Sequence, residues 1–283
     1  MFAATAASGF LVGSAMVATR FVVHDTGPAS LALLRYAIGF CCLLPPALLG
    51  ERARFERRDL LPIALLGITQ FGLLIALLNY GLAFIPAARG ALIFATLPLL
   101  TLLFAVALGR ERLTLAKTTG VVLTIAGVAV ALGEKALAST GTTWIGEAAV
   151  FGSALCGAVC SVLYRPYVRK YPTVPVSAFA MLASVLFLAG LAAREGFFAA
   201  VPAFSPRGWL AVLFIGVNSG VGYYLWLWAL NHAPATRVTV FLSLSPITAA
   251  VLGALLLGEP ISAMVLVALA CVVLGLRLAY RDD

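Results

Sequence analysis

Apolar runs of about twenty residues fill most of the sequence, and short polar or charged connections separate them. An α-helix rises about 1.5 Å per residue, so a run of this length crosses the roughly 30 Å hydrocarbon core of a bilayer. The pattern predicts ten membrane-spanning helices, near residues 3–23, 29–49, 60–84, 87–108, 113–132, 144–168, 174–193, 207–230, 235–257 and 261–280. We therefore expect an all-α integral membrane protein with ten transmembrane helices.

The composition supports this fold class. Of the 283 residues, 63% are hydrophobic and 11% are charged, whereas a soluble domain is about half apolar and one quarter charged. No predicted connection is long enough to hold a soluble domain. No G-x-x-x-x-G-K-[ST] phosphate loop occurs, so the sequence does not indicate ATP hydrolysis. The first apolar run is too long for a signal peptide and lacks a basic leader, so we expect no cleavable signal.

The formal net charge of +8 is distributed unevenly. With ten spans and a cytoplasmic N-terminus, one face of the membrane receives Arg52, Arg54, Arg57, Arg58, Arg110, Arg112, Lys117, Arg165, Arg169, Lys170, Arg277 and Arg281. The other face receives Arg20, Arg89, Lys135, Arg194 and Arg207. The positive-inside rule then predicts that both termini lie in the cytoplasm. The expected location is a bacterial inner membrane. We expect the basic surplus to contact anionic lipid, not nucleic acid.

The sequence contains an internal repeat. The stretch PAARGALIFATLPLL at 86–100 is followed 148 positions later by PATRVTVFLSLSPIT at 234–248, with Pro, Arg and Pro in register. These residue types are costly in a membrane, so their matches carry weight. The repeat predicts two homologous halves, 1–133 and 144–283, joined by a linker at 134–143. Each half has five predicted spans, an odd number, so the second half is inverted, as in secondary transporters that alternate between two open states.

Three repeat-related pairs are candidates for a hinge or a gate: Pro98 and Pro246, Arg89 and Arg237, Glu111 and Glu259. The prolines lie near mid-membrane and are expected to kink their helices and free a backbone carbonyl. The arginines lie one turn inside a span, where they either snorkel to the head groups or latch a gate. The glutamates precede the following helix, where they either cap its N-terminus or act at a gate.

Polar and aromatic side chains concentrate in the spans 60–84 and 207–230. The candidate cargo-binding residues are Gln70, Asn79, Tyr80, Asn218, Tyr224 and Trp228, with Ser14 and Tyr164 added by repeat position. Tyr224 and Trp228 are four residues apart and share a helix face, so they could form an aromatic wall. Alternatively, Trp228 belongs to an aromatic belt at the membrane interface. The buried amides need partners across helices or in a wet cavity.

Charged residues are almost absent from the predicted spans. No Asp or Glu lies deep in a span, so no carboxylate proton relay is visible. Arg35 is the most embedded charge, and it either ties helices together, snorkels, or meets a carboxylate of the cargo. A phosphorylated sugar would need several cavity cations. A zwitterionic amino acid with an apolar side chain, a hydrophobic drug or a small amine would all fit.

Several stretches resemble a known family. ATLPLLTLLFAVALGRERLT (95–114) and SLSPITAAVLGALLLGEPIS (243–262) are similar to the paired signature of the EamA-like branch of the drug/metabolite transporter superfamily. LALLRYAIGF (31–40) and GSAMVATRF (13–21) resemble the second and first helices of that family, although the tryptophan often found in the first helix is absent. The resemblance implies a ten-helix carrier with a central cavity that exports small metabolites, and within the family the chain looks most like the aromatic amino-acid exporter type.

Other chemistry is not supported by the residues available. Intramembrane proteolysis needs a Ser–His pair, two deep aspartates or a zinc motif, and the two histidines lie at span ends. Cys156 and Cys160 share a helix face but have no His or carboxylate neighbour for a metal. We expect no enzyme, metal or cofactor. The predicted function is alternating-access export of amino acids, including aromatic or other hydrophobic ones, by a monomer or homodimer. The alternative is a broad drug or amine efflux carrier.

Overall fold

The computed structural model describes residues 2–50, 54–110, 114–115, 118–120, 122–123, 126–127, 143–200, 202–232, 238, 245–259, 261 and 263–279. Within these ranges the regular structure is entirely helical. The helices are α1 (Phe2–Val22), α2 (Pro28–Leu49), α3 (Arg57–Gly67), η1 (Ile68–Leu73), α4 (Leu74–Phe84), α5 (Ala87–Phe94), α6 (Leu97–Ala107), α8 (Thr143–Leu163), α9 (Arg165–Lys170), α10 (Thr173–Arg194), α11 (Pro206–His232), α13 (Ser245–Leu257) and α14 (Ala263–Ala279).

Six stretches among the described residues are long and apolar enough to cross a membrane: Pro28–Leu49, Arg57–Phe84, Ala87–Ala107, Trp144–Lys170, Thr173–Arg194 and Pro206–His232. Shorter apolar helices run over Gly9–Val22, Ser245–Leu257 and Ala263–Gly275. Most of the predicted span 113–132 lies outside the described residues. Large apolar side chains such as Leu186, Leu213, Leu255 and Leu266 are exposed on several helices. A surface of this kind suits contact with lipid, so the chain is a multi-pass membrane protein.

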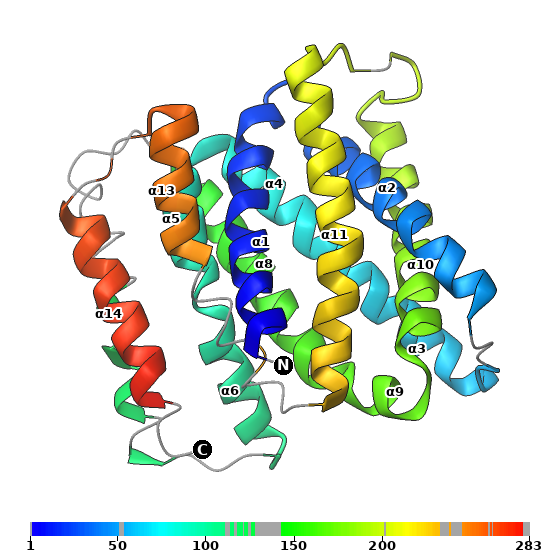
Figure 1. The fold of residues 1–283 in the computed structure, drawn as a ribbon, viewed down its shortest axis with the longest axis horizontal. Helices are drawn as coiled ribbons and strands as arrows, with labels where there is room; N and C mark the ends of the chain where they lie inside the picture. Colours follow the sequence, from blue (N-terminus) through cyan, green and yellow to red (C-terminus); the bar gives the residue numbers. More distant parts are fainter. Residues whose placement is uncertain are drawn as a thin grey trace.

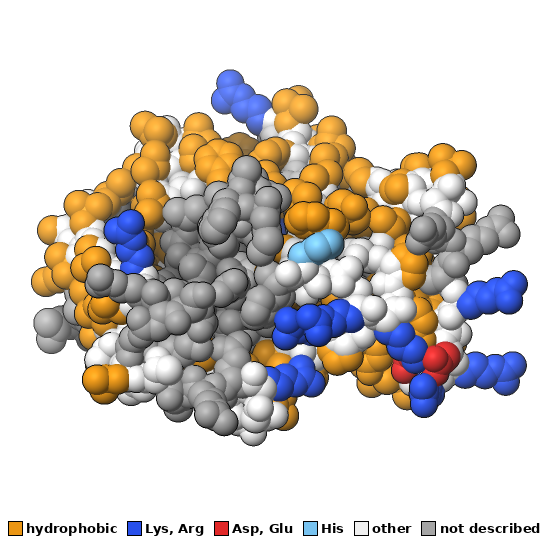
Figure 2. All heavy atoms as spheres, turned by 60° about the horizontal axis from the view of Figure 1, so that its bottom comes forward, with side chains coloured by type: hydrophobic (Ala, Val, Ile, Leu, Met, Phe, Trp, Pro, Cys, Tyr) orange, Lys and Arg blue, Asp and Glu red, His pale blue; other side chains and the backbone are white. Residues whose placement is uncertain are grey.

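The helices form one elongated bundle (Figure 1). α1 begins and α14 ends at the same end of the bundle, the lower one in Figure 1. Figure 2 looks toward that lower end, where several Lys and Arg side chains and few Asp or Glu are visible. Within this lower end, the Lys170 ammonium bonds to Asp59 at 2.7 Å and to Glu56 at 2.6 Å. The contact with Lys170 holds the pKa of the Glu56 carboxyl below its usual range.

Helices of the first half of the sequence pack mainly against helices of the second half. α1 contacts α11 and α13, α2 contacts α10 and α11, and α4 contacts α8. Small residues allow the closest approaches: a Cβ added to Gly67 of α3 would lie 2.2 Å from the Ala180 carbonyl oxygen of α10. Gly39 of α2 similarly faces the backbone of Gly216 and Gly220 on α11. Among the described residues, each cluster of buried apolar side chains therefore contains members of both halves.

The mid-membrane proline Pro98 lies beside a break in its span. α5 ends at Phe94, and Pro98 is the second residue of the next helix, α6. The break at Ala95 and Thr96 lies where a kink caused by Pro98 is expected. Residues 239–244, which precede Pro246, lie outside the described residues, so the kink at Pro246 stays a prediction. The chain turns at the α5–α6 break, where the Thr96 N–H donates to the Ile93 carbonyl at 3.0 Å.

Candidate functional site

A cavity lies at the centre of the bundle. The enclosed space measures about 120 Å³, or about 830 Å³ when the open region at its mouth is included. Side chains from both halves of the sequence line it, on α1, α2, η1, α4, α5, α6, α8 and α11. Its polar lining consists of Arg35, Gln70, Ser161, Asn218 and Ser219, and its aromatic lining of Tyr36, Phe71, Phe94, Tyr223 and Trp226.

Four aromatic rings form a continuous wall on one side of this cavity. Tyr36 meets Phe71 edge-on at 4.9 Å between ring centroids, and Phe71 meets Tyr223 at 4.1 Å. Tyr223 stacks on Trp226 at 5.4 Å. Tyr164 is fully buried behind this wall, with its ring 6.4 Å from Tyr223. The wall offers large apolar faces, which also attract cations through their ring quadrupoles.

Two carboxamides from corresponding repeat positions line the same cavity. Gln70 lies in η1, and its Oε1 atom is buried without a hydrogen-bond partner among the described residues. Asn218 of α11 donates from Nδ2 to the Leu11 carbonyl of α1 at 2.8 Å. The two amides are 148 positions apart, the same spacing that relates Pro98 to Pro246.

Arg35 brings a positive charge into this cavity from α2. Its Nε donates to the Ser219 hydroxyl at 2.5 Å, and that hydroxyl donates in turn to the Ile215 carbonyl at 2.7 Å. The guanidinium carbon is 5.6 Å from the centre of the neighbouring Tyr36 ring. Arg35 thus ties α2 to α11, one of the interpretations that the sequence left open, and it also lines the cavity.

The other predicted cargo-binding residues lie away from the cavity lining. Tyr80 is 40% exposed and packs its ring on Phe84 at 5.1 Å. Asn79 is fully buried and donates to the Pro28 carbonyl at 2.9 Å. Trp228 packs its ring on His232 at 4.4 Å. Tyr224 is partly buried against the core, and Ser14 bonds back to the Leu11 carbonyl of its own helix at 3.0 Å.

Helix geometry explains why Tyr224 and Trp228, the predicted aromatic wall, do not line the cavity. The face of α11 that lines the cavity carries Asn218, Gly222 and Trp226, at steps of four residues, and this spacing was a usable signal. Tyr224 and Trp228 lie two positions further along, on another face. In the preceding half, η1 is a π-helical segment of six residues. The cavity face continues from Gln70 through Leu74 and Leu78 at steps of four residues, and Tyr80, ten positions after Gln70, lies on another face.

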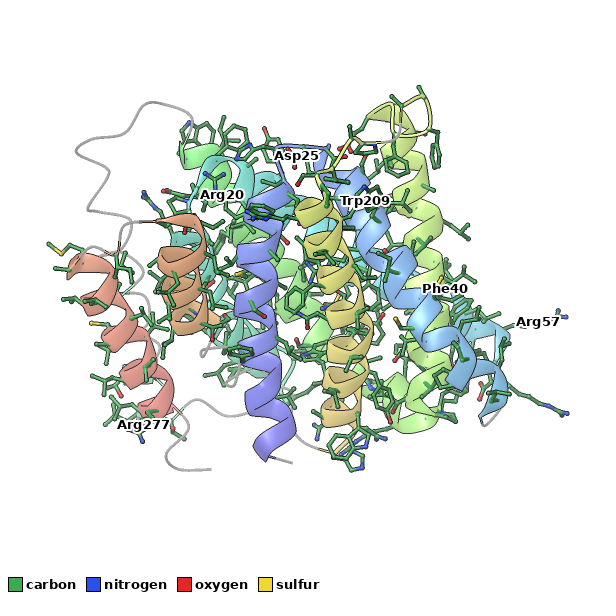
Figure 3. The ribbon with its side chains drawn as sticks, turned by 45° about the horizontal axis from the view of Figure 1, so that its top comes forward. Arg20, Asp25, Phe40, Arg57, Trp209 and Arg277 are labelled. Carbon is green, nitrogen blue, oxygen red and sulfur yellow. The ribbon has the colours of Figure 1, made fainter. Side chains whose placement is uncertain are left out.

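A second set of polar contacts joins helices at the end of the bundle where α1 ends, shown with Arg20 labelled in Figure 3. Arg20 Nη1 donates to the carbonyls of Leu82 and Ala83 at 2.7 and 3.0 Å, and its Nε lies 3.8 Å from Glu259. The Glu259 carboxylate accepts from the Ala87 N–H at 3.1 Å. Glu259 therefore caps α5 in the other half of the sequence. Residues 260 and 262 lie outside the described residues, so capping of the following helix by Glu259 stays a prediction.

Arg89 forms an ion pair with Glu147 of α8, and it is only 8% exposed. A cation in this position is paired inside the protein, so the interpretation that Arg89 snorkels to the head groups was wrong. Its repeat counterpart Arg237, and Glu111, lie outside the described residues.

A third glutamate at this end, Glu195, caps a helix of the first half as Glu259 does. Glu195 accepts from the Ala29 and Ser30 N–H groups, at 3.0 and 2.7 Å, and from the Ser30 hydroxyl. It thereby caps the N-terminus of α2. Glu147, Glu195 and Glu259 all belong to the second half and all bind groups of the first. We call them the three bridging glutamates. Val22, Leu82 and Ile85 are fully buried, so the described helices are tightly packed at this end of the bundle.

A multi-pass bundle of apolar helices around a polar and aromatic cavity is the architecture of a membrane carrier. Comparison with known proteins makes the class specific: the sequence matches the EamA-like transporter family over residues 2–133 and again over residues 144–281. The chain belongs to this family, whose members are transporters and not enzymes.

Relatives and a solved structure extend the comparison over nearly the whole chain. The chain is 31% identical over 273 residues to a probable terminal-alkyne amino-acid exporter of Streptantibioticus cattleyicolor, covering 95% of this chain and 89% of that protein. It is 26% identical over 281 residues to an uncharacterized transporter of Archaeoglobus fulgidus, covering 95% and 94%. A crystal structure at 22% identity shares the fold, with a TM-score of 0.73 over 98% of this chain and 96% of the other.

Proposed function

We propose that this transporter moves amino acids with aromatic or other hydrophobic side chains out of the cell by alternating access. The central cavity carries this proposal, because both halves of the sequence line it with aromatic rings and carboxamides, and Arg35 is the cation among the described lining residues. Such a lining suits an amphipathic cargo with a small polar group and an apolar body. The relative that is described as a probable terminal-alkyne amino-acid exporter supports an amino-acid cargo.

The proposed architecture is ten spans in two inverted halves. Helix packing supports it, because contacts between helices occur in pairs that the 148-residue repeat relates. The α1–α11 contact corresponds to α8–α4, the α2–α11 contact to α10 with α3 and η1, and the α1–α13 contact to α8 with α5 and α6. Two halves that exchange equivalent contacts can adopt two states of similar energy, one open to each side of the membrane.

In the proposed mechanism, the three bridging glutamates latch one mouth of the carrier. Releasing the Arg20–Glu259 and Arg89–Glu147 contacts allows α1, α5 and α8 to separate at that end. The break before Pro98 acts as one hinge, because a helix start can change direction without losing a hydrogen bond, and the repeat-related position at Pro246 is proposed as the other. Arg237 and Glu111 are proposed to form the corresponding latch at the opposite mouth.

The proposed location is the bacterial inner membrane with both termini in the cytoplasm. The Lys- and Arg-rich end of the bundle then faces the cytoplasm, as the positive-inside rule requires, and the three bridging glutamates face outward. The partners are the lipid bilayer and the small-molecule cargo.

Counterflow in proteoliposomes tests the function. Vesicles with the purified protein are loaded with unlabelled L-phenylalanine and given labelled L-phenylalanine outside, with and without a proton gradient. Transient accumulation of label without any gradient is the expected result, because a carrier exchanges its cargo in both directions. Failure to accumulate label, together with accumulation of an amine or a hydrophobic drug in the same preparation, would contradict the amino-acid proposal and favour the drug or amine carrier.

A further inference from the structure

We infer that Arg35 is the anchor for a carboxylate of the cargo, so the site selects hydrophobic monocarboxylates, amino acids among them, over amines. The inference rests on the proposed transport function and specifies its substrate class. It is carried by the state of the Arg35 side chain: a cation that faces the central cavity without an anion beside it.

The charge balance of the cavity is the first step. Among the described residues that line it, Arg35 is the charged one, and no carboxylate is present. A cation inside a membrane protein normally pairs with an anion, because transfer from water to a medium of low dielectric constant is strongly unfavourable. The described lining therefore leaves the charge of Arg35 unbalanced, and an anionic group of the cargo can balance it.

The geometry of Arg35 is the second step. Among the described residues, its guanidinium has one hydrogen-bond acceptor, the Ser219 hydroxyl, and that bond uses Nε. This contact and the Tyr36 ring fix the plane of the group. The two terminal nitrogens keep their donors for the cavity, and a planar carboxylate can accept two parallel hydrogen bonds from a guanidinium. A single such group matches a monoanion.

The remaining polar lining indicates how an amino group would be held. Gln70 Oε1 is a buried acceptor that no described donor satisfies, and leaving such an atom unpaired is costly. An α-ammonium group can donate to it, while the rings of Phe71, Tyr223 and Trp226 hold the apolar side chain. This contact is neutral on the protein side, so it adds less to binding than the charge-assisted pair at Arg35.

The specificity test uses three ligands that differ in one group each. Purified protein in lipid nanodiscs binds labelled L-phenylalanine, and the competitors are 3-phenylpropionate, which lacks the ammonium, and 2-phenylethylamine, which lacks the carboxylate. We expect 3-phenylpropionate to compete within about tenfold of L-phenylalanine and 2-phenylethylamine to be weaker by at least tenfold, the difference associated with a charged hydrogen bond. Equal competition by the two analogues in the unaltered protein overturns the inference.

Variants assign the selectivity to residues. Arg35→Gln is expected to weaken both carboxylate ligands at least tenfold and to remove the preference over the amine, and Arg35→Lys to restore part of it. Gln70→Met is expected to weaken L-phenylalanine but not 3-phenylpropionate. Arg207→Gln removes an exposed arginine of α11 and is the matched control. Undiminished carboxylate binding in Arg35→Gln overturns the anchor.

Failure of the amino-acid proposal remains distinguishable from failure of the anchor. If labelled L-phenylalanine does not bind, labelled 3-phenylpropionate is tested directly on the unaltered protein and on Arg35→Gln. Binding that depends on Arg35 then keeps the carboxylate anchor and rejects only the amino-acid cargo. Absence of binding rejects both.

Discussion

Neutralising Glu259 should open the end of the bundle that it latches. The substitution Glu259→Gln keeps an acceptor for the Ala87 N–H but removes the negative charge that faces Arg20 and the N-terminus of α5. The side chains of Arg20 and Glu259 are 24% and 14% exposed, so the pair is partly shielded from water. We expect the latch to weaken without loss of the fold, because the carboxamide occupies the same space.

The size of the effect follows from the contacts. At 3.8 Å and an effective dielectric constant of about 20, the charge pair has an upper bound of about 4 kcal/mol, and partial exposure reduces this to about 1 kcal/mol. A charged hydrogen bond exceeds a neutral one by about 1 kcal/mol, which applies to the Ala87 contact. The closed state thus loses about 2 kcal/mol relative to the open one, an increase of about thirtyfold in the open-to-closed ratio.

A cysteine reporter in the cavity measures this ratio. The five native cysteines are replaced, and Ile75, which lines the cavity, is changed to cysteine and labelled with a membrane-impermeant maleimide. The reagent reaches one end of the protein in intact cells and the other in inverted membrane vesicles. Glu259→Gln is expected to speed labelling about thirtyfold in intact cells alone.

The control for this measurement is Asp25→Asn, which removes an exposed charge near the same end (Figure 3). It should leave the labelling rate unchanged. The reasoning is refuted if Glu259→Gln changes the rate in neither preparation, or if Asp25→Asn raises it equally.

Further predictions concern packing, the cavity and the hinge. Gly67→Ala should lower the free energy of unfolding by roughly 1–3 kcal/mol, and with it the melting temperature, because the added Cβ meets a backbone carbonyl of α10. Gly190→Ala on α10, with open space around it, should leave the melting temperature unchanged. Trp226→Ala should weaken cargo binding about tenfold, whereas Trp228→Ala, outside the cavity lining, should leave it within about twofold in the same binding assay. Pro98→Ala should slow counterflow several-fold while equilibrium cargo binding is retained; equal loss of both would argue against a hinge.

The sequence predicts the helices and the family more reliably than it predicts the cavity. Apolar run length identifies a span because the bilayer fixes the length that is needed, and the concentration of polar residues in two spans pointed to the carboxamides Gln70 and Asn218. Which face of a helix looks inward depends on packing, and that is where the expectation failed: Tyr223 and Trp226 line the cavity, not Tyr224. The hydrophobic periodicity of the sequence does not mark the π-helical segment η1 before α4.

The ion pairs were difficult to predict for a related reason. Arg89 and Glu147 are separated by 58 positions and belong to different halves, so no local spacing connects them. The sequence marked Arg89 as an unusual charge one turn inside a span, but a lone arginine near an interface is ordinarily expected to reach the head groups. Only the interleaving of the halves brings the partners together.

The latched end of the bundle has a kinetic consequence for the proposed carrier. If the latched state is the resting one, the empty carrier mostly offers its site to the opposite side of the membrane. The half-saturating concentration of cargo is then lower on that side than on the latched side. Cargo on the latched side can bind only to the small fraction of carriers that are open to it. The ratio of the two turnover rates must compensate, because an uncoupled carrier cannot shift the equilibrium of its cargo. Such a transporter collects cargo efficiently on one side and recaptures it poorly on the other, without an energy source.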